Sequence, residues 1–178
     1  GKTYASAFAV SSVTPKRVLF LVHREQVARQ AMESYQRVIG DSVTYGVLSG
    51  TAKGFSETYL FATMQMMSKA DCYERFSPTD FDIIVIDEAH RAGSESYHRI
   101  MEYFTPKFWF AMTASPERTD DFDIYKLFDY NIIHEIRLQH ALEADLLCPF
   151  HYFGIGQLSD GIRTYEGDEA QTVFANEW

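Results

Sequence analysis

The sequence predicts an α/β domain of three layers with a mostly parallel central sheet. Short apolar runs recur along the first two thirds of the chain, for example Val18–Val22 and Ile83–Ile86. Unbroken runs of this kind suit strands that are buried on both faces, because helices cover both sides of a parallel sheet. Segments with helical spacing, such as Val27–Ile39, lie between the runs. This alternation of strands and helices is typical of a parallel α/β domain.

The elements follow one another in a regular order up to about Phe128. The expected strands are Val18–Val22, Val43–Leu48, Tyr59–Thr63, Ile83–Ile86 and Phe108–Met112. The expected helices are Tyr4–Val10, Val27–Ile39, Met64–Lys69 and Glu95–Phe104. Gly40 and Pro106 stop the second and the last of these helices. Thr51–Thr58 is expected to be an exposed turn or a weak helix, and Asp71–Asp80 a connector.

The remainder of the chain has weaker signals. We expect helical structure near Ile124–Phe128, a strand at Asn131–Leu138, a helix at Gln139–Leu147 and the start of a strand within Phe150–Ile155. From Gln157 onward, glycines and many acidic residues predict a loosely packed tail.

Composition and charge limit the classes of function. The 178 residues, 46% of them hydrophobic, suit one domain with a full core. The net charge of −9 argues against nucleic-acid binding over the whole surface, but not along one local face. No apolar run approaches the about 20 residues of a membrane span, and no signal peptide precedes the domain, so we expect no membrane partner and a cytoplasmic location. Cys72 and Cys148 are expected to be unpaired thiols.

Two adjacent acids, Asp87 and Glu88, follow the apolar run Ile83–Ile86. Open α/β sheets bind ligands at the carboxyl ends of their strands, and two acids buried there are costly unless a cation compensates them. A solvated acidic turn is the alternative. Gly1-Lys2-Thr3 favours a ligand site, because G-K-[ST] ends a phosphate-binding loop whose lysine reaches phosphates and whose hydroxyl binds Mg²⁺.

Further polar clusters each follow an apolar strand or lie at a strand–helix junction, and together they resemble those of a known family. The clusters are Gly1-Lys2-Thr3, Leu21–Arg24, Thr63–Gln65, Asp87–His90 and Thr113–Ser115. In this order they resemble motifs I, Ia, Ib, II and III of the first RecA-like domain of superfamily 2 helicases and translocases. Asp87–His90 matches the DEAH box letter for letter. The resemblance covers residues 1 to about 118 and implies a RecA-like P-loop NTPase fold.

The resemblance implies ATP hydrolysis with ATP and Mg²⁺ as ligands. Gly1, Lys2 and Thr3 would bind the nucleotide, and Thr3 and Asp87 would hold the ion. Lys2 would neutralise phosphate charge during the reaction. Glu88 would polarise the attacking water.

Further roles are implied away from the nucleotide. Residues expected to couple the nucleotide site to nucleic acid are His90, Thr113 and Ser115. Residues expected to contact the sugar–phosphate backbone are His23, Arg24, Thr63 and Gln65. The alternatives are a solvated helix start for His23 and Arg24, and a helix N-cap for Thr63.

The segment Thr113–Arg118 resembles the T-A-T-P-E-R version of motif III in the type III restriction enzyme Res-subunit group, with Ser115 in place of the commoner threonine. This resemblance makes DNA the expected partner. An RNA helicase of the same superfamily and a catalytically silent nucleic-acid-binding module remain the alternatives.

The implied division of the chain is a first RecA-like domain over residues 1–148, beginning within the phosphate loop, and the crossing toward a second RecA-like domain over 149–178. Leu142–Phe153 resembles this crossing. Because such enzymes complete the site between two domains of the same full-length chain, we expect these 178 residues alone to hydrolyse ATP poorly.

Overall fold

A computed structural model describes residues 1–89, 94–113, 128, 153–158 and 161–166. The chain divides into two compact units, Gly1–Asn131 and Ile132–Trp178. The expected boundary after residue 148 stays a prediction. The expected structure at Ile124–Phe128, Asn131–Leu138 and Gln139–Leu147 lies outside the described residues, apart from Phe128 itself.

The first unit contains a five-stranded sheet whose strands are all parallel, in the order β2-β3-β1-β4-β5. The strands are β1 (Val18–Val22), β2 (Tyr45–Leu48), β3 (Tyr59–Thr63), β4 (Ile83–Asp87) and β5 (Phe108–Met112). The helices are α1 (Lys2–Ser12), α2 (Glu25–Ile39), α3 (Met64–Met67), α4 (Ala70–Tyr73) and α5 (Glu95–Tyr103), with a 3₁₀ turn at Gly40–Ser42. The expected strands and longer helices are confirmed to within a few residues at their ends.

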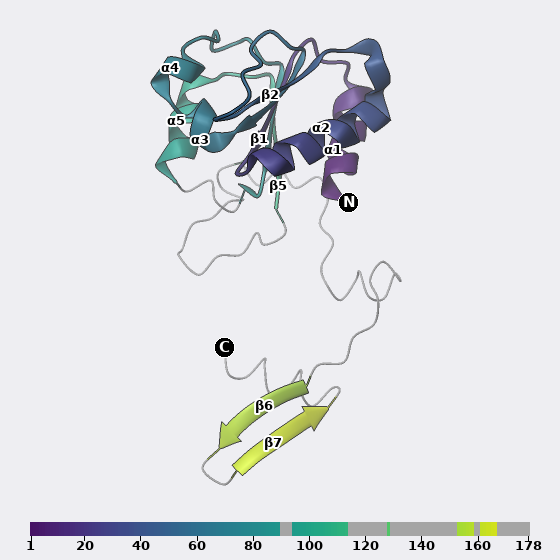
Figure 1. Ribbon diagram of the computed structural model, residues 1–178, viewed down its shortest axis with the longest axis vertical. Helices are drawn as coiled ribbons and strands as arrows, with labels where there is room; N and C mark the ends of the chain where they lie inside the picture. Colours follow the sequence, from purple (N-terminus) through teal and green to yellow (C-terminus); the bar gives the residue numbers. More distant parts are fainter. Residues whose placement is uncertain (90–93, 114–127, 129–152, 159–160, 167–178) are drawn as a thin grey trace. The chain divides into compact units, whose positions relative to one another are not determined.

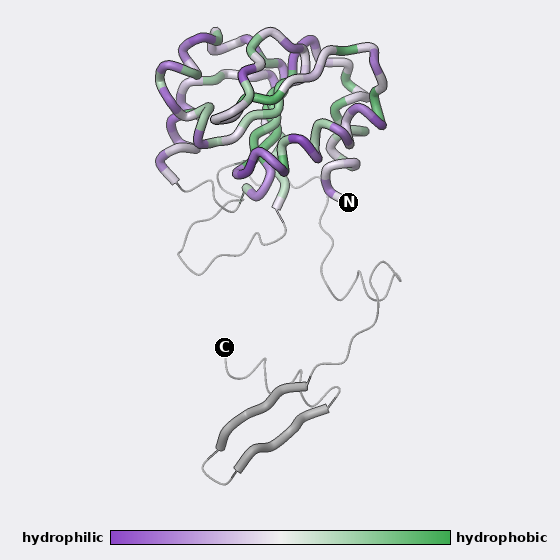
Figure 2. Tube along the Cα trace, viewed as in Figure 1, coloured by the Kyte–Doolittle hydropathy of each residue, from purple (hydrophilic) through white to green (hydrophobic). Residues whose placement is uncertain are grey.

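Alternate side chains of each strand enter two different cores, one on each face of the sheet. On β1, Phe20 packs in the core with α1 and α2, while Leu19 and Leu21 pack in the core with α3, α4 and α5. Figure 1 shows these two sets of helices around the sheet, and Figure 2 shows that the most hydrophobic segments are the central strands. The three-layer α/β prediction is therefore confirmed.

The core beneath α1 and α2 is rich in aromatic rings. Tyr35 of α2 contacts Phe20 and Phe61 edge to face, with ring centroids 5.4 and 5.2 Å apart. Burial of each such side chain contributes about 1.5–3 kcal/mol. The Tyr35 hydroxyl also donates a hydrogen bond to Ser6 Oγ at 3.0 Å, and this bond joins α2 to α1. These contacts fix α1, and with it Lys2, against the sheet.

Two expectations for irregular structure were wrong. The first residues of the expected connector Asp71–Asp80 belong to α4, a single turn that buries Cys72. One turn is too short to show helical periodicity, so packing rather than pattern specifies it. The expected loose tail instead contains an antiparallel pair, β6 (Phe153–Leu158) and β7 (Gly161–Glu166). The β-branched and aromatic residues of β7 favour a strand despite the flanking glycines and acids.

The start of β6 at Phe153 agrees with the strand expected within Phe150–Ile155. In the described part of the chain, no helix is both long and apolar enough to cross a membrane.

Candidate functional site

The carboxyl ends of all strands in the first unit meet at one edge of the sheet, because every neighbouring pair is parallel. Thr63 at the end of β3 is paired in register with Val22 at the end of β1, and Asp87 at the end of β4 with Met112 of β5. The predicted polar clusters that the structure describes are therefore neighbours at this edge. Ligands bind at this edge in open α/β sheets.

Lys2 and Glu88 meet at this edge. Lys2 Nζ lies 3.3 Å from Glu88 Oε1, and both side chains are 41% exposed. Lys2 is the first residue of α1, with Gly1 as the N-cap. The structure thus brings Lys2 to Glu88, and the nucleotide-binding roles of Gly1, Lys2 and Thr3 stay predictions.

Asp87 is half-buried beside Glu88, and its environment raises the pKa of its carboxyl. Burial raises the pKa of its carboxyl, the ammonium of Lys2 opposes that rise, and the charge of Glu88 adds to it. Asp87 Oδ1 also accepts a hydrogen bond of 3.0 Å from the backbone N–H of Glu88. The protein groups alone therefore leave the negative charge of Asp87 incompletely compensated.

The backbone at Glu88 has a left-handed conformation, with φ of 54°. For a residue with a Cβ this conformation costs of order 1 kcal/mol or more, and such residues cluster at functional sites. Thr14, in the turn after α1, shares the feature with φ of 44°, so positive φ alone does not define a site. At Glu88 it coincides with the end of a buried strand and with a carboxylate turned toward Lys2.

The donor set fits Mg²⁺. The ion prefers oxygen ligands, takes only one or two carboxylates and keeps waters or phosphate oxygens in its other positions. Asp87 and Thr3 offer a carboxylate and a hydroxyl, and the raised pKa of Asp87 shows that added positive charge would be favourable there. The described residues contain no cluster of three or more His, Cys, Asp or Glu that could hold a metal by themselves. A shared site with phosphate is consistent with both observations.

His23 follows β1 and contacts the helix after the acid pair. Its Nε2 lies 2.9 Å from the buried hydroxyl of Tyr97 on α5, and the two rings are 5.8 Å apart. The charge of His23 also lowers the pKa of Asp87, as a smaller effect than those of burial and Lys2. His23 therefore contacts α5 and interacts electrostatically with Asp87, and its expected contact with nucleic acid stays a prediction. The sequence contains no signal for its pairing with Tyr97.

Arg24, Thr63 and Gln65 are at the same edge in different environments. Arg24 is exposed and is the N-cap residue of α2, without a side-chain capping bond. Thr63 is 8% exposed and is the N-cap residue of α3, again without a side-chain capping bond. Gln65 is exposed on α3. The N-cap alternative for Thr63 is thus correct in position, but its hydroxyl does not act as the cap.

The coupling residues are only partly described. Thr113 directly follows β5 and is half-buried. His90 and Ser115 lie outside the described residues, so their expected contact across neighbouring strands stays a prediction.

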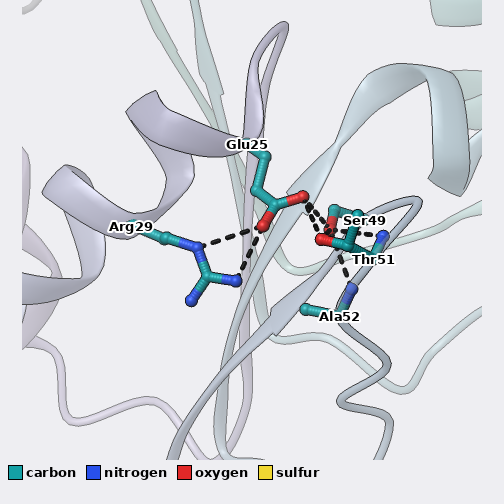
Figure 3. A network of polar contacts seen from close by, with 5 residues as sticks. All are labelled: Glu25, Arg29, Ser49, Thr51 and Ala52. Atoms are coloured by element: carbon teal, nitrogen blue, oxygen red, sulfur yellow. Dashed lines mark hydrogen bonds and ion pairs between the residues drawn. The ribbon is translucent and has the colours of Figure 1, made fainter.

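Glu25 also lies at this edge, and the sequence predicts no role for it. Figure 3 shows its carboxylate between Arg29 of the same helix and the turn that follows β2. Oε1 accepts hydrogen bonds from Arg29 Nη2 at 2.7 Å and Nε at 3.1 Å. Oε2 accepts from the hydroxyls of Ser49 at 2.5 Å and Thr51 at 2.6 Å. The i,i+4 pair is visible in the sequence. The contact with the turn is not, because it joins residues 24 and 26 positions apart.

Glu25 is strongly stabilised as an anion. Hydrogen bonds from Ser49, Thr51 and Arg29 lower the pKa of its carboxyl to about 2, against the smaller opposing effect of burial. Its position in the first turn of α2 adds the favourable interaction of an acid with a helix N-terminus.

Comparison with solved structures supports the fold assignment. A nuclease-deletion mutant of the Type ISP restriction-modification enzyme LlaGI in complex with a DNA substrate mimic matches with a TM-score of 0.56 at 19% identity, over 82% of this chain and 18% of that chain. The Hef helicase domain of Pyrococcus furiosus matches with a TM-score of 0.57 at 22% identity, over 74% of this chain and 31% of that chain. At these identities the likeness establishes the fold, which is that of RecA-like helicase domains.

Comparison with curated proteins gives relatives that are much longer than this chain. The Type I restriction enzyme EcoAI endonuclease subunit of Escherichia coli is 26% identical over 161 residues, which are 84% of this chain and 20% of that protein. The Putative mitochondrial ATP-dependent helicase irc3 of Schizosaccharomyces pombe is 27% identical over 90 residues, 50% of this chain and 14% of that protein. The chain thus spans about a fifth or less of the length of these relatives.

A family model supplies the assignment. Residues 1–118 match the model described as "Type III restriction enzyme, res subunit", and this segment holds the whole parallel sheet and the edge with Lys2, Asp87 and Glu88. The chain therefore belongs to the type III restriction enzyme Res-subunit family and carries a RecA-like domain of superfamily 2 helicases.

Proposed function

We propose that this chain is the first motor domain of an ATP-dependent DNA helicase or duplex DNA translocase of the DEAH-box type. The observation that carries the proposal is the contact of 3.3 Å between Lys2 Nζ and Glu88 Oε1. The contact supports the proposal that Gly1-Lys2-Thr3 is the end of a phosphate-binding loop, because it brings Lys2 to an acid pair at the edge of a parallel sheet where ligands bind.

The contact between Lys2 and Glu88 also supports a sequence of events. A bound triphosphate competes with Glu88 for Lys2, because several phosphate oxygens offer the ammonium more negative charge than one half-exposed carboxylate. Lys2 then neutralises charge on the β- and γ-phosphates. Glu88, released from Lys2, orients the attacking water and accepts its proton.

Thr3 and Asp87 would hold the Mg²⁺ ion, which stabilises charge on the phosphate oxygens during transfer. The charge on Asp87 is costly in its half-buried position, so the nucleotide–metal complex and the acid stabilise each other. Gly1 is the N-cap of α1, and the first N–H groups of this helix would bind the phosphates.

The nucleic-acid strand would lie along the same edge, near the ends of β1 and β3. His23 and Arg24 are exposed and would contact the sugar–phosphate backbone. Thr63, the last residue of β3, and Gln65, on α3, would contribute to the same contact. His90, Thr113 and Ser115 would couple this face to the acid pair. Thr113 directly follows Met112, the residue of β5 that is paired in register with Asp87.

DNA is proposed over RNA because the family model is that of a restriction enzyme subunit. RNA is the second candidate, because a putative ATP-dependent RNA helicase of Acanthamoeba polyphaga mimivirus is 21% identical over 154 residues, 85% of this chain and 29% of that protein. A catalytically silent module is disfavoured, since Lys2, Thr3, Asp87 and Glu88 have no evident need to be together without a nucleotide.

The test measures ATP hydrolysis by the full-length protein alone, with duplex DNA and with RNA. Stimulation by DNA above that by RNA supports the proposal, and stronger stimulation by RNA favours the RNA helicase. Nucleic-acid binding without ATP binding or hydrolysis supports the silent module and overturns the motor. Under the same conditions we expect the isolated 178 residues to hydrolyse ATP poorly, because the second RecA-like domain completes the site.

A further inference from the structure

Glu25 joins two segments that leave the carboxyl edge of the sheet at different places. α2 begins at Glu25 directly after His23 and Arg24, which follow β1. Residues 49–52, here called the β2 turn, follow β2. β3 lies between β1 and β2 in the sheet and ends at Thr63. The tie between Glu25 and the β2 turn therefore joins the segments that follow β1 and β2, the two strands on either side of β3.

The β2 turn is closed by its own hydrogen bonds. Ser49 is 1% exposed, and its Oγ accepts from the backbone N–H groups of Thr51 at 3.2 Å and Ala52 at 3.1 Å. The Ser49 N–H donates to Ala52 O at 2.7 Å. The hydroxyl of Ser49 also donates a hydrogen bond to Glu25, so the hydroxyl acts both as a donor and as an acceptor. The turn is thus held as one unit, and Glu25 attaches that unit to α2.

The two oxygens of the Glu25 carboxylate bind different segments, and this distinguishes the contact from an ordinary surface ion pair. One oxygen is sufficient for Arg29, whose side chain is 52% exposed, and such pairs contribute little to stability. The second oxygen is bound by two hydroxyls of another segment at short distances, 2.5 and 2.6 Å. This second set of bonds fixes the position of the turn relative to Arg24.

Electrostatics alone would disfavour an acid at this position. A carboxylate beside a nucleic-acid strand repels the phosphates, and the chain already carries a net charge of −9. Arg29, the two hydroxyls and the start of α2 offset the charge of Glu25. Because these groups compensate its charge, Glu25 can serve at this edge as a structural link between α2 and the β2 turn.

We propose that Glu25 is a positioning residue for the nucleic-acid strand, holding the β2 turn against the start of α2 so that both segments face the sugar–phosphate backbone as one surface. The strand contacts Arg24 and the exposed side of the turn at Gly50, where an added Cβ would meet no protein atom within 4 Å. The inference rests on the proposed nucleic-acid motor. It adds the β2 turn to the binding surface and gives Glu25 its role there.

The decisive experiment measures affinity for fluorescently labelled duplex DNA in the full-length protein and its Glu25→Gln variant. Removal of an acid that acts only through charge would tighten binding, whereas loss of the tie weakens it. We expect weakening of roughly threefold to tenfold, the range for losing one or two hydrogen bonds to a charged group. Nucleic-acid-independent ATP hydrolysis should stay at the wild-type rate. Equal or tighter binding by the variant overturns the inference.

Glu95→Gln is the matched control. Glu95 likewise occupies the first turn of a helix, α5, and pairs with the residue four positions on, Arg99, at 2.7 Å. Its side chain is 86% exposed, and the structure shows no bond from it to another segment in the described residues. DNA affinity should be unchanged by this substitution. A loss equal to that of Glu25→Gln would show that the bonds to the β2 turn are not the cause, and it would contradict the inference.

A second pair of variants addresses the turn side of the tie without changing charge. Thr51→Val removes the hydroxyl but keeps the side-chain shape, and Thr51→Ser keeps the hydroxyl. Thr51 is exposed, so both variants should fold. We expect Thr51→Val to weaken DNA binding and Thr51→Ser to bind as the wild type does. Equal affinities of the two variants would contradict the positioning role.

Salt dependence separates positioning from direct contact. Arg24→Ala should lower the slope of log K against log [salt] by about one, because one phosphate contact is lost. Glu25→Gln should weaken binding with an unchanged slope, because Glu25 contacts no phosphate. If the wild-type protein binds neither DNA nor RNA, the proposed function itself fails. If it binds and Glu25→Gln leaves affinity unaltered, only the role of Glu25 fails.

Discussion

Lys2 Nζ lies 3.3 Å from Glu88 Oε1, although 86 positions separate the two residues in the chain. The ion pair brings the first residue of α1 to the end of the buried strand β4. Both side chains are 41% exposed, so the pair contributes little to stability. Its position matters more for the proposed motor, in which Lys2 would bind the triphosphate and Glu88 would orient the attacking water.

Glu88→Gln should therefore leave folding and nucleotide binding nearly intact while it abolishes turnover. The amide keeps the size of the side chain but cannot accept a proton from water, so ATP hydrolysis by the full-length protein should fall by at least about a hundredfold. Thermal unfolding, equilibrium binding of a fluorescent ATP analogue and steady-state hydrolysis measure the three properties. Unchanged hydrolysis would remove Glu88 from its assigned role.

Asp87→Asn should raise thermal stability while it removes activity. Burial raises the pKa of the Asp87 carboxyl above its unfolded value, so the ionised form disfavours folding at neutral pH. The neutral amide avoids this cost and can still accept the hydrogen bond from the Glu88 N–H. We expect a higher Tm than that of the wild type near pH 7, with the difference shrinking as pH falls and Asp87 protonates.

Asp82→Asn is the opposite case and serves as its control. A hydrogen bond from Lys107, at 2.7 Å, and the backbone N–H of Lys16 lower the pKa of Asp82. Its ionised form therefore favours folding, and the amide should lower Tm. Differential scanning fluorimetry of both variants at neutral pH should give shifts of opposite sign. Destabilisation by Asp87→Asn would show that its charge is already compensated by the protein.

Structural features that show as a pattern in neighbouring residues were predicted correctly from the sequence. The run Ile83–Ile86 predicts a strand because burial on both faces requires apolar side chains at every position. Asp87 and Thr63 share an edge because parallel pairing brings the ends of β4, β1 and β3 together. The proximity of Lys2 to Glu88 was expected from the phosphate-loop motif and not from strand pairing.

Structural features that depend on residues distant in the sequence show no such local pattern and were not predicted. The helical turn α4 is specified by burial of Cys72 in the core, and the role of Glu25 depends on hydroxyls supplied by another segment. The N-cap position of Thr63 was foreseeable from its place before a helix, but the absence of a capping bond was not. The local sequence reveals periodicity and turn-forming residues, whereas contacts between segments at the edge of the sheet become visible only in the folded structure.

The contact between Tyr97 and His23 predicts a specific effect on coupling. The hydroxyl of Tyr97, a fully buried residue of α5, lies 2.9 Å from His23 Nε2 and orients the imidazole that we propose contacts nucleic acid. Tyr97→Phe should weaken stimulation of ATP hydrolysis by DNA, with a higher DNA concentration at half-stimulation and an unchanged unstimulated rate. The loss of stability should be about 1 kcal/mol, as for one hydrogen bond.

Tyr103→Phe provides the comparison on the same helix. The hydroxyl of Tyr103 donates to Phe76 O at 2.7 Å and does not contact the carboxyl edge of the sheet. Its removal should cost a similar amount of stability and leave DNA stimulation unaltered. If the two variants lost stimulation to the same degree, general destabilisation and not the orientation of His23 would be the cause.

The hydrogen bonds of Glu25 predict a stabilising effect that acid removes. Ser49, Thr51 and Arg29 lower the pKa of Glu25 from 4.5 to about 2. An acid with a depressed folded pKa stabilises the fold above its unfolded pKa, and this contribution disappears as pH falls through the folded value. Wild-type Tm should therefore decline more steeply than that of Glu25→Gln between pH 4.5 and about 2. Thr51→Val should show an intermediate slope, because one of the two hydroxyl donors to Oε2 is lost. Parallel Tm profiles for all three proteins would mean that the carboxylate is not held by the turn.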